Sequence, residues 1–408
     1  MSADTLWAPD VTWNPDSAWG GSSSALPSWS APSASAFEIT VYDKAFARRG
    51  WVGNPQALRV TVRHNALGTA TLTLASDHRR LTDLVAPGAR VVITYDGQHL
   101  LSGPVRRLRG KGPGLSGTVE VDVEDDWRLL TRVLGWPVPG AALTAQTVAY
   151  DVRTGPAETV VKGLVTANAV TRLGLPVTVA TDQARGGTIS TSHRMHPLID
   201  RLLPALDGAG LGVTVKQSGA GFLVDCYVPR VYPRTLTEAS GVVQDWSWSQ
   251  AGPTATRVVL GAQGEAEARD FISSADMARE AEWEDVIEVF RDGRDSSDAT
   301  VNANRLAEAL TEGAPKSGLA VTLSETKTFR YGRTVAGGGV LVGDRVRVEV
   351  GPGVVVEDVL REATLSWTTG DGLEVTPVIG ERTDDPDTAL ARSLTALARG
   401  VRDLRAGR

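Results

Sequence analysis

Apolar and polar positions alternate in short runs between residues 37 and 145, which is the pattern of half-buried β-strands. Turns rich in Gly, Pro and Asn separate the runs. This arrangement predicts a small antiparallel barrel or sandwich. The apolar residues Trp127, Leu130 and Leu134 then predict a short helix that ends at Gly135 and Pro137. The predicted strands cover residues 37–41, 58–62, 70–74, 91–94 and 119–123.

Helical spacing replaces the alternation between about 150 and 230. Pro156 and Pro197 each stand where a helix would begin. Pro204 should kink or shorten the second helix, because proline removes a backbone donor. Strands at 212–215 and 222–228 complete a mixed α/β unit. The two apolar stripes consist of Val160, Val161, Leu164 and Val165, and of Leu198, Leu202 and Leu206.

Alternation resumes after about residue 240 and predicts a second β-rich domain. One helix interrupts it at 298–311, with Asp298 as its cap and Gly313 at its end. Leu306 and Leu310 are expected to point inward from this helix. The predicted strands cover residues 246–248, 257–260, 282–290, 319–323, 346–350 and 365–367.

An internal repeat relates the two β-rich regions. At an offset of 255, residues 88–93 (GARVVI) align without gaps over residues 343–348 (GDRVRV), and 104–106 over 359–361. Both copies give a turn, a strand, a Gly-containing turn and a second strand. We interpret the match as two copies of one barrel with the α/β unit between them, although short Val, Arg and Gly matches also arise by chance.

The N-terminal 36 residues are dense in Trp, Pro, Ser and Ala and too poor in aliphatic residues to form a core. Trp7, Trp13 and Trp19 recur every six residues. Three interpretations remain open for this segment: a disordered leader, an arm whose indole rings dock on a neighbouring subunit, and a carbohydrate-stacking surface.

The last residues predict an amphipathic helix, with Asp385 as cap and Pro386 in its first turn. Its apolar spacing of four, three, four and three is that of a coiled-coil seam, but the seam covers only about two heptads. Association of these helices and packing on the chain's own body therefore both remain open. The seam residues are Leu390, Leu394, Leu397, Val401 and Leu404.

Composition narrows the classes of function. The chain carries 42 Lys and Arg against 48 Asp and Glu, a net charge of −6, so no basic field is available for sequence-specific nucleic-acid binding. The sequence contains no run of about 18 apolar residues, so we expect no stable association with a membrane. The first ten residues lack the features of an export signal. Cys226 is the single cysteine, so an intrachain disulfide and a four-cysteine zinc site are excluded and cytoplasmic folding fits best.

The candidate catalytic and ligand motifs are weak. Residues 112–117 spell GPGLSG, but a strand rather than a helix follows, so a hairpin turn is favoured over dinucleotide binding. His193 and His196 lack the glutamate of a zinc protease and are expected to be surface histidines. The carboxylates at 122–126 and 280–288 are expected on solvated faces. The series Asp292, Asp295 and Asp298 lacks a calcium loop's glycine. We predict no catalytic residue, metal or cofactor.

The order of several motifs resembles one family: the minor tail proteins that form the tail-tip hub of siphophages infecting actinobacteria. The resemblance covers about residues 37–380, and the motifs are strand starts, turns and a helix cap rather than catalytic residues. They are 37–43 (FEITVYD), 101–105 (LSGPV), 125–130 (DDWRLL), 153–160 (RTGPAETV) and 165–168 (VTAN).

The resemblance implies a homotrimer that presents six related barrels to a six-fold tail tube. It also implies a place in the virion at the tail tip after assembly in the host cytoplasm, and a hub that gates genome passage. The implied partners are the distal tail protein, the tail tube, the tape measure protein and the tail fibre or spike proteins. Enzymatic activity is not required, although a tail-associated cell-wall hydrolase and a receptor- or glycan-binding tail protein remain alternatives.

These observations predict a β-rich α+β chain with two related small β-barrels and an inserted α/β unit. We expect five segments: a Trp/Pro/Ser-rich arm at 1–36, a first barrel at 37–145, a mixed α/β domain at 146–235, a second barrel with one helix at 236–383, and an amphipathic helix at 384–408.

Overall fold

The computed structural model describes residues 37–379, except 113–116, 265, 295, 327–328 and 333–338. Strands account for 46% and helices for 21% of these residues, which confirms a β-rich α+β chain. No helix in the described part of the chain is both long enough and apolar enough to cross a membrane.

The first β-rich region forms from the alternating runs and encloses a core that includes Val41, Val60, Leu72, Ile93 and Val121. Every predicted strand of this region is present. The region also contains β2, which lacks an alternating apolar pattern and has mostly exposed side chains. Its elements are β1 (Phe37–Tyr42), β2 (Arg48–Trp51), β3 (Ala57–Arg63), β4 (Thr69–Ala75), α1 (Leu81–Val85), β5 (Arg90–Tyr95), β6 (Gln98–Lys111) and β7 (Thr118–Glu124).

The second β-rich region has its own core, which includes Val321, Val346, Val348, Leu360 and Ile379. Its elements are β15 (Val231–Leu236), β16 (Val243–Ala251), β20 (Lys316–Leu323), β21 (Arg330–Tyr331), β22 (Gly339–Val340), β23 (Arg345–Gly351), β24 (Val354–Thr368) and β25 (Gly372–Ile379).

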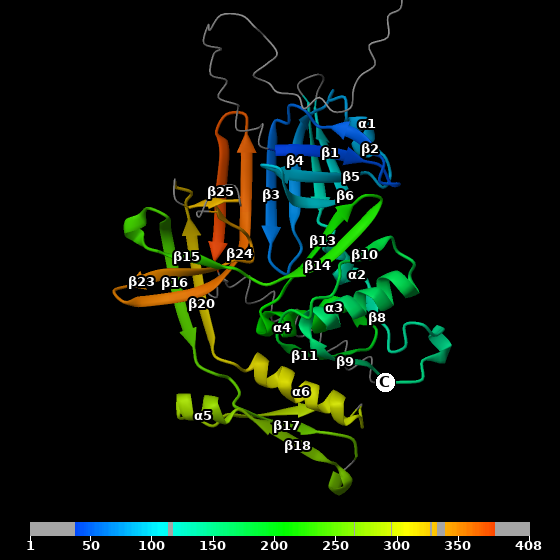
Figure 1. Cartoon of the computed structure of the whole chain (residues 1–408), viewed down its shortest axis with the longest axis vertical. Coiled ribbons are helices and arrows are strands. Elements are labelled where there is room, and N and C mark those ends of the chain that lie inside the picture. The colour runs from blue at the N-terminus through cyan, green and yellow to red at the C-terminus, as the bar shows by residue number, and fades with distance from the viewer. Residues whose placement is uncertain are drawn as a thin grey trace, which may run out of the picture.

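The two regions share one sheet of 13 strands in the order β16-β20-β25-β24-β3-β4-β7-β6-β5-β1-β2, with β23 joined to β24 and β15 to β23. Figure 1 shows β24 beside β3 at the centre of this sheet. The prediction of two closed barrels is therefore wrong, because the sheet remains open. The outer edge of β3 pairs with β24 of the other region instead of returning to β2.

The α/β unit lies between the two regions in sequence and packs its helices against a third core. Its small sheet has the order β10-β14-β13, with β10 parallel to β14. Further short pairs join β9 to β11 and β8 to β12. Its elements are α2 (Arg128–Arg132), β8 (Leu134–Gly135), β9 (Asp151–Pro156), α3 (Ala157–Val165), β10 (Val177–Val179), β11 (Thr188–His193), β12 (His196–Pro197), α4 (Leu198–Ala209), β13 (Gly212–Ser218) and β14 (Gly221–Tyr227).

Two local predictions in this unit are corrected by the structure: the helical position of Leu134 and the shortening of α4 at Pro204. Leu134 does not lie on the apolar face of a helix, because α2 ends at Arg132 and Leu134 stands exposed in β8. Helix α4 continues through Pro204 to Ala209. Burial of Leu202 and Leu206 on either side of the proline offsets the lost backbone hydrogen bond.

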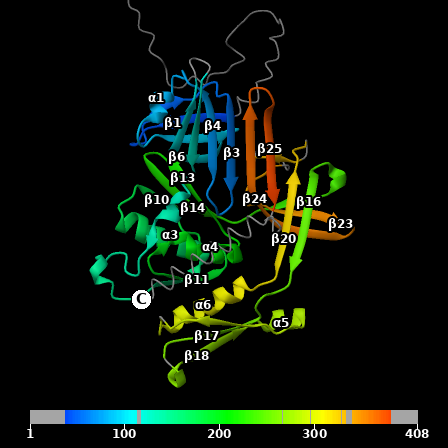
Figure 2. The same cartoon turned by 180° about the vertical axis from the view of Figure 1, so that it is seen from behind.

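A small unit is inserted between β16 and β20 and lies at one end of the molecule, as Figure 2 shows. Helix α6 covers one face of the sheet β18-β17-β19. Asp298 caps α6 as predicted, since its side chain accepts from the backbone of Thr300 and Val301. The strand expected at 282–290 begins only at Glu288, because α5 occupies the first residues. Its elements are β17 (Arg257–Gly261), β18 (Phe271–Ala275), α5 (Met277–Trp283), β19 (Glu288–Asp292) and α6 (Ala299–Glu312).

Candidate assembly surface

The repeated sequence forms two hairpins that share one register over four pairs, from Arg90 to Ile93 and from Arg345 to Val348, before their loops. In β5–β6, Arg90 lies opposite Pro104. In β23–β24, Arg345 lies opposite Val359, and both partners are displaced by the offset of 255 found in the sequence. The register also shifts at corresponding places, after Val105 in β6 and after Leu360 in β24. The repeat is therefore structural, and the two hairpins are equivalent.

The equivalence extends to two sets of four strands. The order β3-β4-β7-β6 in the first region matches β16-β20-β25-β24 in the second. We call these sets the first and the second repeat. They meet edge to edge, because β24 of the second repeat pairs antiparallel with β3 of the first.

Side chains on both faces of the β24–β3 contact fit each other. On the polar face, Arg63 Nε donates to Glu362 Oε2 at 2.6 Å, and the hydroxyls of Thr61 and Thr364 lie 3.2 Å apart. On the opposite face, Leu365 and Trp367 join the core of the first region. The contact between repeats therefore combines a backbone ladder, a buried apolar face and paired polar groups.

One face of the joined sheet is polar, because the strands alternate and both cores lie on the opposite face. Oppositely charged side chains pair across some neighbouring strands of this face, as where Arg109 pairs with Glu120 and Asp122. Further members of this face are Arg59, Arg63, Thr69, Thr71, Thr73, Arg107, Lys111, Glu124, Glu362, Ser366, Glu374 and Thr376. Such a face suits a wall in contact with water.

Two strand edges within the first and second repeats lack a partner in the described chain. The C-terminal half of β6 pairs with β7 on one side only, and β16 pairs with β20 on one side only. Arg107 and Lys111 are exposed along β6, and Trp248 of β16 is 43% exposed. An unpaired edge is a template for another strand, so both edges are candidate contact sites.

A buried ion pair fixes the first region to the α/β unit. Arg90 Nη2 donates to Asp126 Oδ1 at 2.6 Å, and Ser102 Oγ donates to Asp126 Oδ2 at 2.8 Å. The same Ser102 oxygen accepts from the backbone N–H of Gln217 in β13, whose side chain accepts from Arg90 Nε. Asp126 is 1% exposed, so the prediction that this carboxylate cluster lies on a solvated face is wrong for it.

Neighbouring buried groups have shifted pKa values. Burial raises the pKa of Asp125 to about 7, although backbone N–H groups bound to its carboxylate oppose the shift. Burial lowers the pKa of His64 to about 4, and His64 Nδ1 lies 2.7 Å from the hydroxyl of Tyr227. Both groups sit where β3 and β7 end against the α/β unit, so they act on the stability of that contact.

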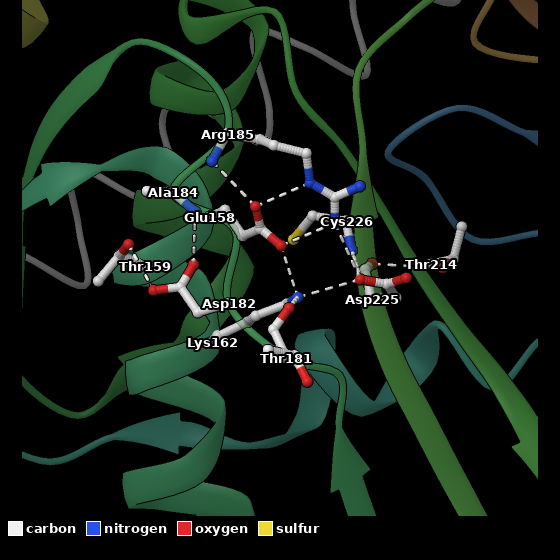
Figure 3. Close-up of polar contacts among 10 residues, drawn as sticks. All are labelled: Glu158, Thr159, Lys162, Thr181, Asp182, Ala184, Arg185, Thr214, Asp225 and Cys226. Carbon is white, nitrogen blue, oxygen red and sulfur yellow. Dashed lines mark hydrogen bonds and ion pairs between the residues drawn. The ribbon is translucent and has the colours of Figure 1, made fainter.

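Figure 3 shows a polar cluster where α3, β14 and the chain near Arg185 meet. Glu158 is fully buried and accepts from Lys162 Nζ at 2.5 Å and from Arg185 Nη2 at 2.7 Å. The same two cations donate to Asp225 Oδ1 at 3.0 and 3.1 Å. We call these four residues, Glu158, Lys162, Arg185 and Asp225, the charge cluster.

The charges of the charge cluster are paired with one another. Two cations balance two anions, and the hydrogen bonds from Arg185 hold the pKa of Glu158 well below its usual range. Burial raises the pKa of the adjacent Cys226 thiol to about 12, so this thiol is not a nucleophile at neutral pH. The cluster therefore clamps α3, β14 and the chain around Arg185 together.

The other candidates from the sequence fall in different places. His193 is buried in β11, where burial lowers its pKa to about 3, so the prediction of a surface residue is wrong for it. Asp292 pairs with Arg269 and Arg294. Glu280 is buried against Arg257, so the prediction of a solvated face is wrong for this carboxylate as well. Among the described residues, no group of three or more His, Cys, Asp or Glu could hold a metal.

The sequence-predicted interface residues lie outside the described residues. These are Trp7, Trp13 and Trp19 of the N-terminal arm, and Leu390, Leu394, Leu397, Val401 and Leu404 of the C-terminal helix. The described candidates are instead the β6 and β16 edges, which the sequence did not single out. The internal repeat was the signal that could have revealed them.

Comparisons with known proteins agree with this architecture. A family described as Siphovirus ReqiPepy6 Gp37-like protein matches residues 38–381. The prophage MuSo2 43 kDa tail protein from Shewanella oneidensis has a TM-score of 0.52 at 13% identity, covering 84% of this chain and 98% of that chain, which shows a shared fold. A tail protein from Neisseria meningitidis MC58 has a TM-score of 0.48 at 14% identity, covering 85% of this chain and 97% of that chain. No curated protein matches the chain.

Proposed function

The chain belongs to the siphovirus family of ReqiPepy6 Gp37-like proteins and has the fold of a phage tail protein, and on this premise we propose that it is the structural hub of the tail tip. Three copies form a homotrimer that presents six repeats to the six-fold tail tube. The hub joins the tube and the distal tail protein to the three-fold fibre or spike proteins. It also gates the passage of the genome and the tape measure protein.

The observation that carries this proposal is the pair of register-matched repeats within one chain. A chain with two equivalent repeats gives six in a trimer, so it can face a six-fold partner on one side and a three-fold partner on the other. Contacts between unlike edges close into a ring when the rotation between subunits permits it. The polar sheet face then supplies a wetted inner wall.

Two segments are assigned to the assembly from the sequence pattern. We assign Trp7, Trp13 and Trp19 to an arm that docks on a neighbouring subunit, because buried indole rings are strong interface anchors. The seam from Leu390 to Leu404 is assigned to association of the three C-terminal helices. In this proposal the protein assembles in the cytoplasm of an actinobacterial host and is then a virion component at the tail tip.

Copy number in purified particles tests the hub. Quantitative mass spectrometry should give three copies of this chain per particle. The tube protein should be far more abundant, with six copies in each of many rings. Dozens of copies would place the chain along the tail and would contradict the proposal.

The arm is tested by replacing Trp7, Trp13 and Trp19 with alanine, with Trp29→Ala as the matched control outside the six-residue spacing. Loss of the chain from particles in the triple variant alone supports docking. Normal assembly with loss of glycan binding would instead assign the tryptophans to a receptor.

A further inference from the structure

We propose that the free edge of β6 in one copy pairs antiparallel with β16 of the next copy, with Leu108 opposite Trp248 and Lys111 opposite Asp245. This inference rests on the proposed trimeric hub. It adds which strands meet between chains and in which register.

The two free edges are the equivalents of the two edges that already pair within the chain. Strand β24, the equivalent of β6, uses its second edge to bind β3. Strand β3, the equivalent of β16, uses its second edge to bind β24. In the described chain, β6 and β16 are the members of the repeats whose corresponding edges stay empty. A β6–β16 contact between copies would therefore reproduce the contact that joins the repeats within one copy.

The register follows from the ladders of paired residues. Following the paired residues from β6 through β7 and β4 leads to Val60 of β3. Following them from β24 through β25 and β20 leads to Trp246 of β16, so Val60 and Trp246 occupy equivalent positions. Within the chain, Val60 lies opposite Leu365, whose equivalent in β6 is Gly110. Gly110 is thus placed opposite Trp246 of the next copy. Strand alternation then places Leu108 opposite Trp248, Arg109 opposite Ser247, and Lys111 opposite Asp245.

The side chains brought together by this register are complementary. Leu108 packs at the margin of the first core, and Trp248 is exposed in the isolated chain, so their contact would cover apolar surface. Gly110 leaves room for the indole of Trp246. On the polar face, Lys111 and Asp245 carry opposite charges, which favours a cross-strand pair. A displacement by one residue would move Trp248 to the polar face.

The stagger of the contact is that of a closed barrel. A ladder of paired residues runs from Leu108 through Val121, Leu72 and Leu58 to Trp367. With the offset of 255, Trp367 is the equivalent of residue 112. Crossing one repeat therefore moves the ladder along the strand by four residues, from the position of Leu108 to that of residue 112. Six repeats would give a shear of about 24 for about 24 strands. This is the ratio of an eight-stranded barrel of shear eight, whose strands tilt by about 36°.

The corresponding barrel would be wide. Strands about 4.8 Å apart and tilted by about 36° give a backbone diameter of about 45 Å. Barrels of 16 to 18 strands already hold an aqueous channel. The proposed ring would therefore leave an open lumen lined by the polar sheet face.

Disulfide trapping in assembled particles tests the register. Residues Thr61 and Thr364 mark a close pair without backbone hydrogen bonds, because the backbone N–H of His64 donates to Arg361 three residues away along each strand. The equivalent pair between copies is Arg109 and Ser247, so Arg109→Cys with Ser247→Cys should give a covalent trimer on a non-reducing gel. Native Cys226 is buried and does not compete.

Two controls make the result decisive. Thr61→Cys with Thr364→Cys should form an intrachain disulfide and no covalent oligomer, which verifies that the oxidation conditions are sufficient. Arg109→Cys with Asp245→Cys, two residues out of register on the same face, should remain uncrosslinked. Should the first double variant fail to enter particles, Lys111→Cys with Asp245→Cys samples the same register.

The outcomes separate this inference from the hub proposal. A covalent trimer that forms with Arg109→Cys and Ser247→Cys, but not with the out-of-register pair, supports both the β6–β16 register and the trimeric hub. Three copies per particle without that crosslink, while the Thr61–Thr364 control oxidises, overturn the β6–β16 register and leave the hub intact. A copy number other than three overturns the hub as well.

Discussion

Arg63 and Glu362 lie 299 residues apart in sequence, and their side chains form a 2.6 Å ion pair across the β3–β24 contact. Both side chains are about one-third exposed, so this pair contributes at most about 1 kcal/mol. Its value is in marking the register in which the two repeats meet. The stabilisation of the contact comes from the backbone ladder and the apolar side chains on its other face.

Trp367→Ala should therefore destabilise the chain far more than Arg63→Ala. Trp367 is 7% exposed and packs in the first core opposite Leu58, so its loss should lower the free energy of unfolding by about 3–5 kcal/mol. Arg63→Ala should cost less than about 1 kcal/mol. Urea unfolding of both variants measures the difference. Equal losses would mean that the ion pair, not the apolar face, holds the repeats together.

Charge reversal at the proposed intermolecular edge should weaken trimer association. Lys111→Glu places a glutamate opposite Asp245 of the next copy, and the repulsion between the two carboxylates should reduce association several-fold. Asp245→Lys in the same chain should restore it, whereas the single exchange Lys44→Glu in an exposed loop should have little effect. Analytical ultracentrifugation measures the three variants. Failure of the double exchange to recover would argue against this pairing.

Glu158→Gln should destabilise the α/β unit strongly. The substitution leaves Lys162 and Arg185 with Asp225 as their remaining anionic partner in the charge cluster. Breaking a buried ion pair on one side costs about 3–5 kcal/mol. Arg291→Ala, which removes an exposed pair with Glu312, should cost less than about 1 kcal/mol. Thermal unfolding compares the two, and a small effect of Glu158→Gln would show that the cluster is not a clamp.

Asp125→Asn should stabilise the protein in a pH-dependent way. The folded-state pKa of about 7 lies above the unfolded value of about 3.9, so the wild-type chain loses stability as the pH rises from about 4 through 7. The variant lacks this loss and should gain up to about 4 kcal/mol over wild type above pH 7, with little difference at pH 4. Glu120→Gln on the exposed polar face is the control. A gain independent of pH would exclude ionisation of Asp125 as the cause.

Local structure was largely predictable because alternation and helical spacing record which side chains are buried. The strands around Val60, Leu72 and Val121, and the capping of α6 by Asp298, follow directly from such patterns. The β5–β6 and β23–β24 hairpins were found because their turns and strands kept the same spacing. Strand β2 was missed because its exposed residues lack an apolar pattern.

Long-range relationships could not be read from the sequence. Alternation fixes the buried face of β3 but not its neighbour, so the pairing with β24 and the open sheet were missed. The charge cluster joins residues from separate segments, and only Glu158 and Lys162 have a helical i, i+4 spacing. Asp126 and His193 looked like surface residues because burial of a polar side chain depends on partners brought in by the fold.

Cryo-electron microscopy of intact particles, averaged at the tail tip, tests the central claim most directly. The hub predicts three copies that form a ring of six repeats below the tube, with β6 of each copy beside β16 of the next. A single peripheral copy, or density within a fibre, would contradict the hub and favour receptor binding or cell-wall hydrolysis.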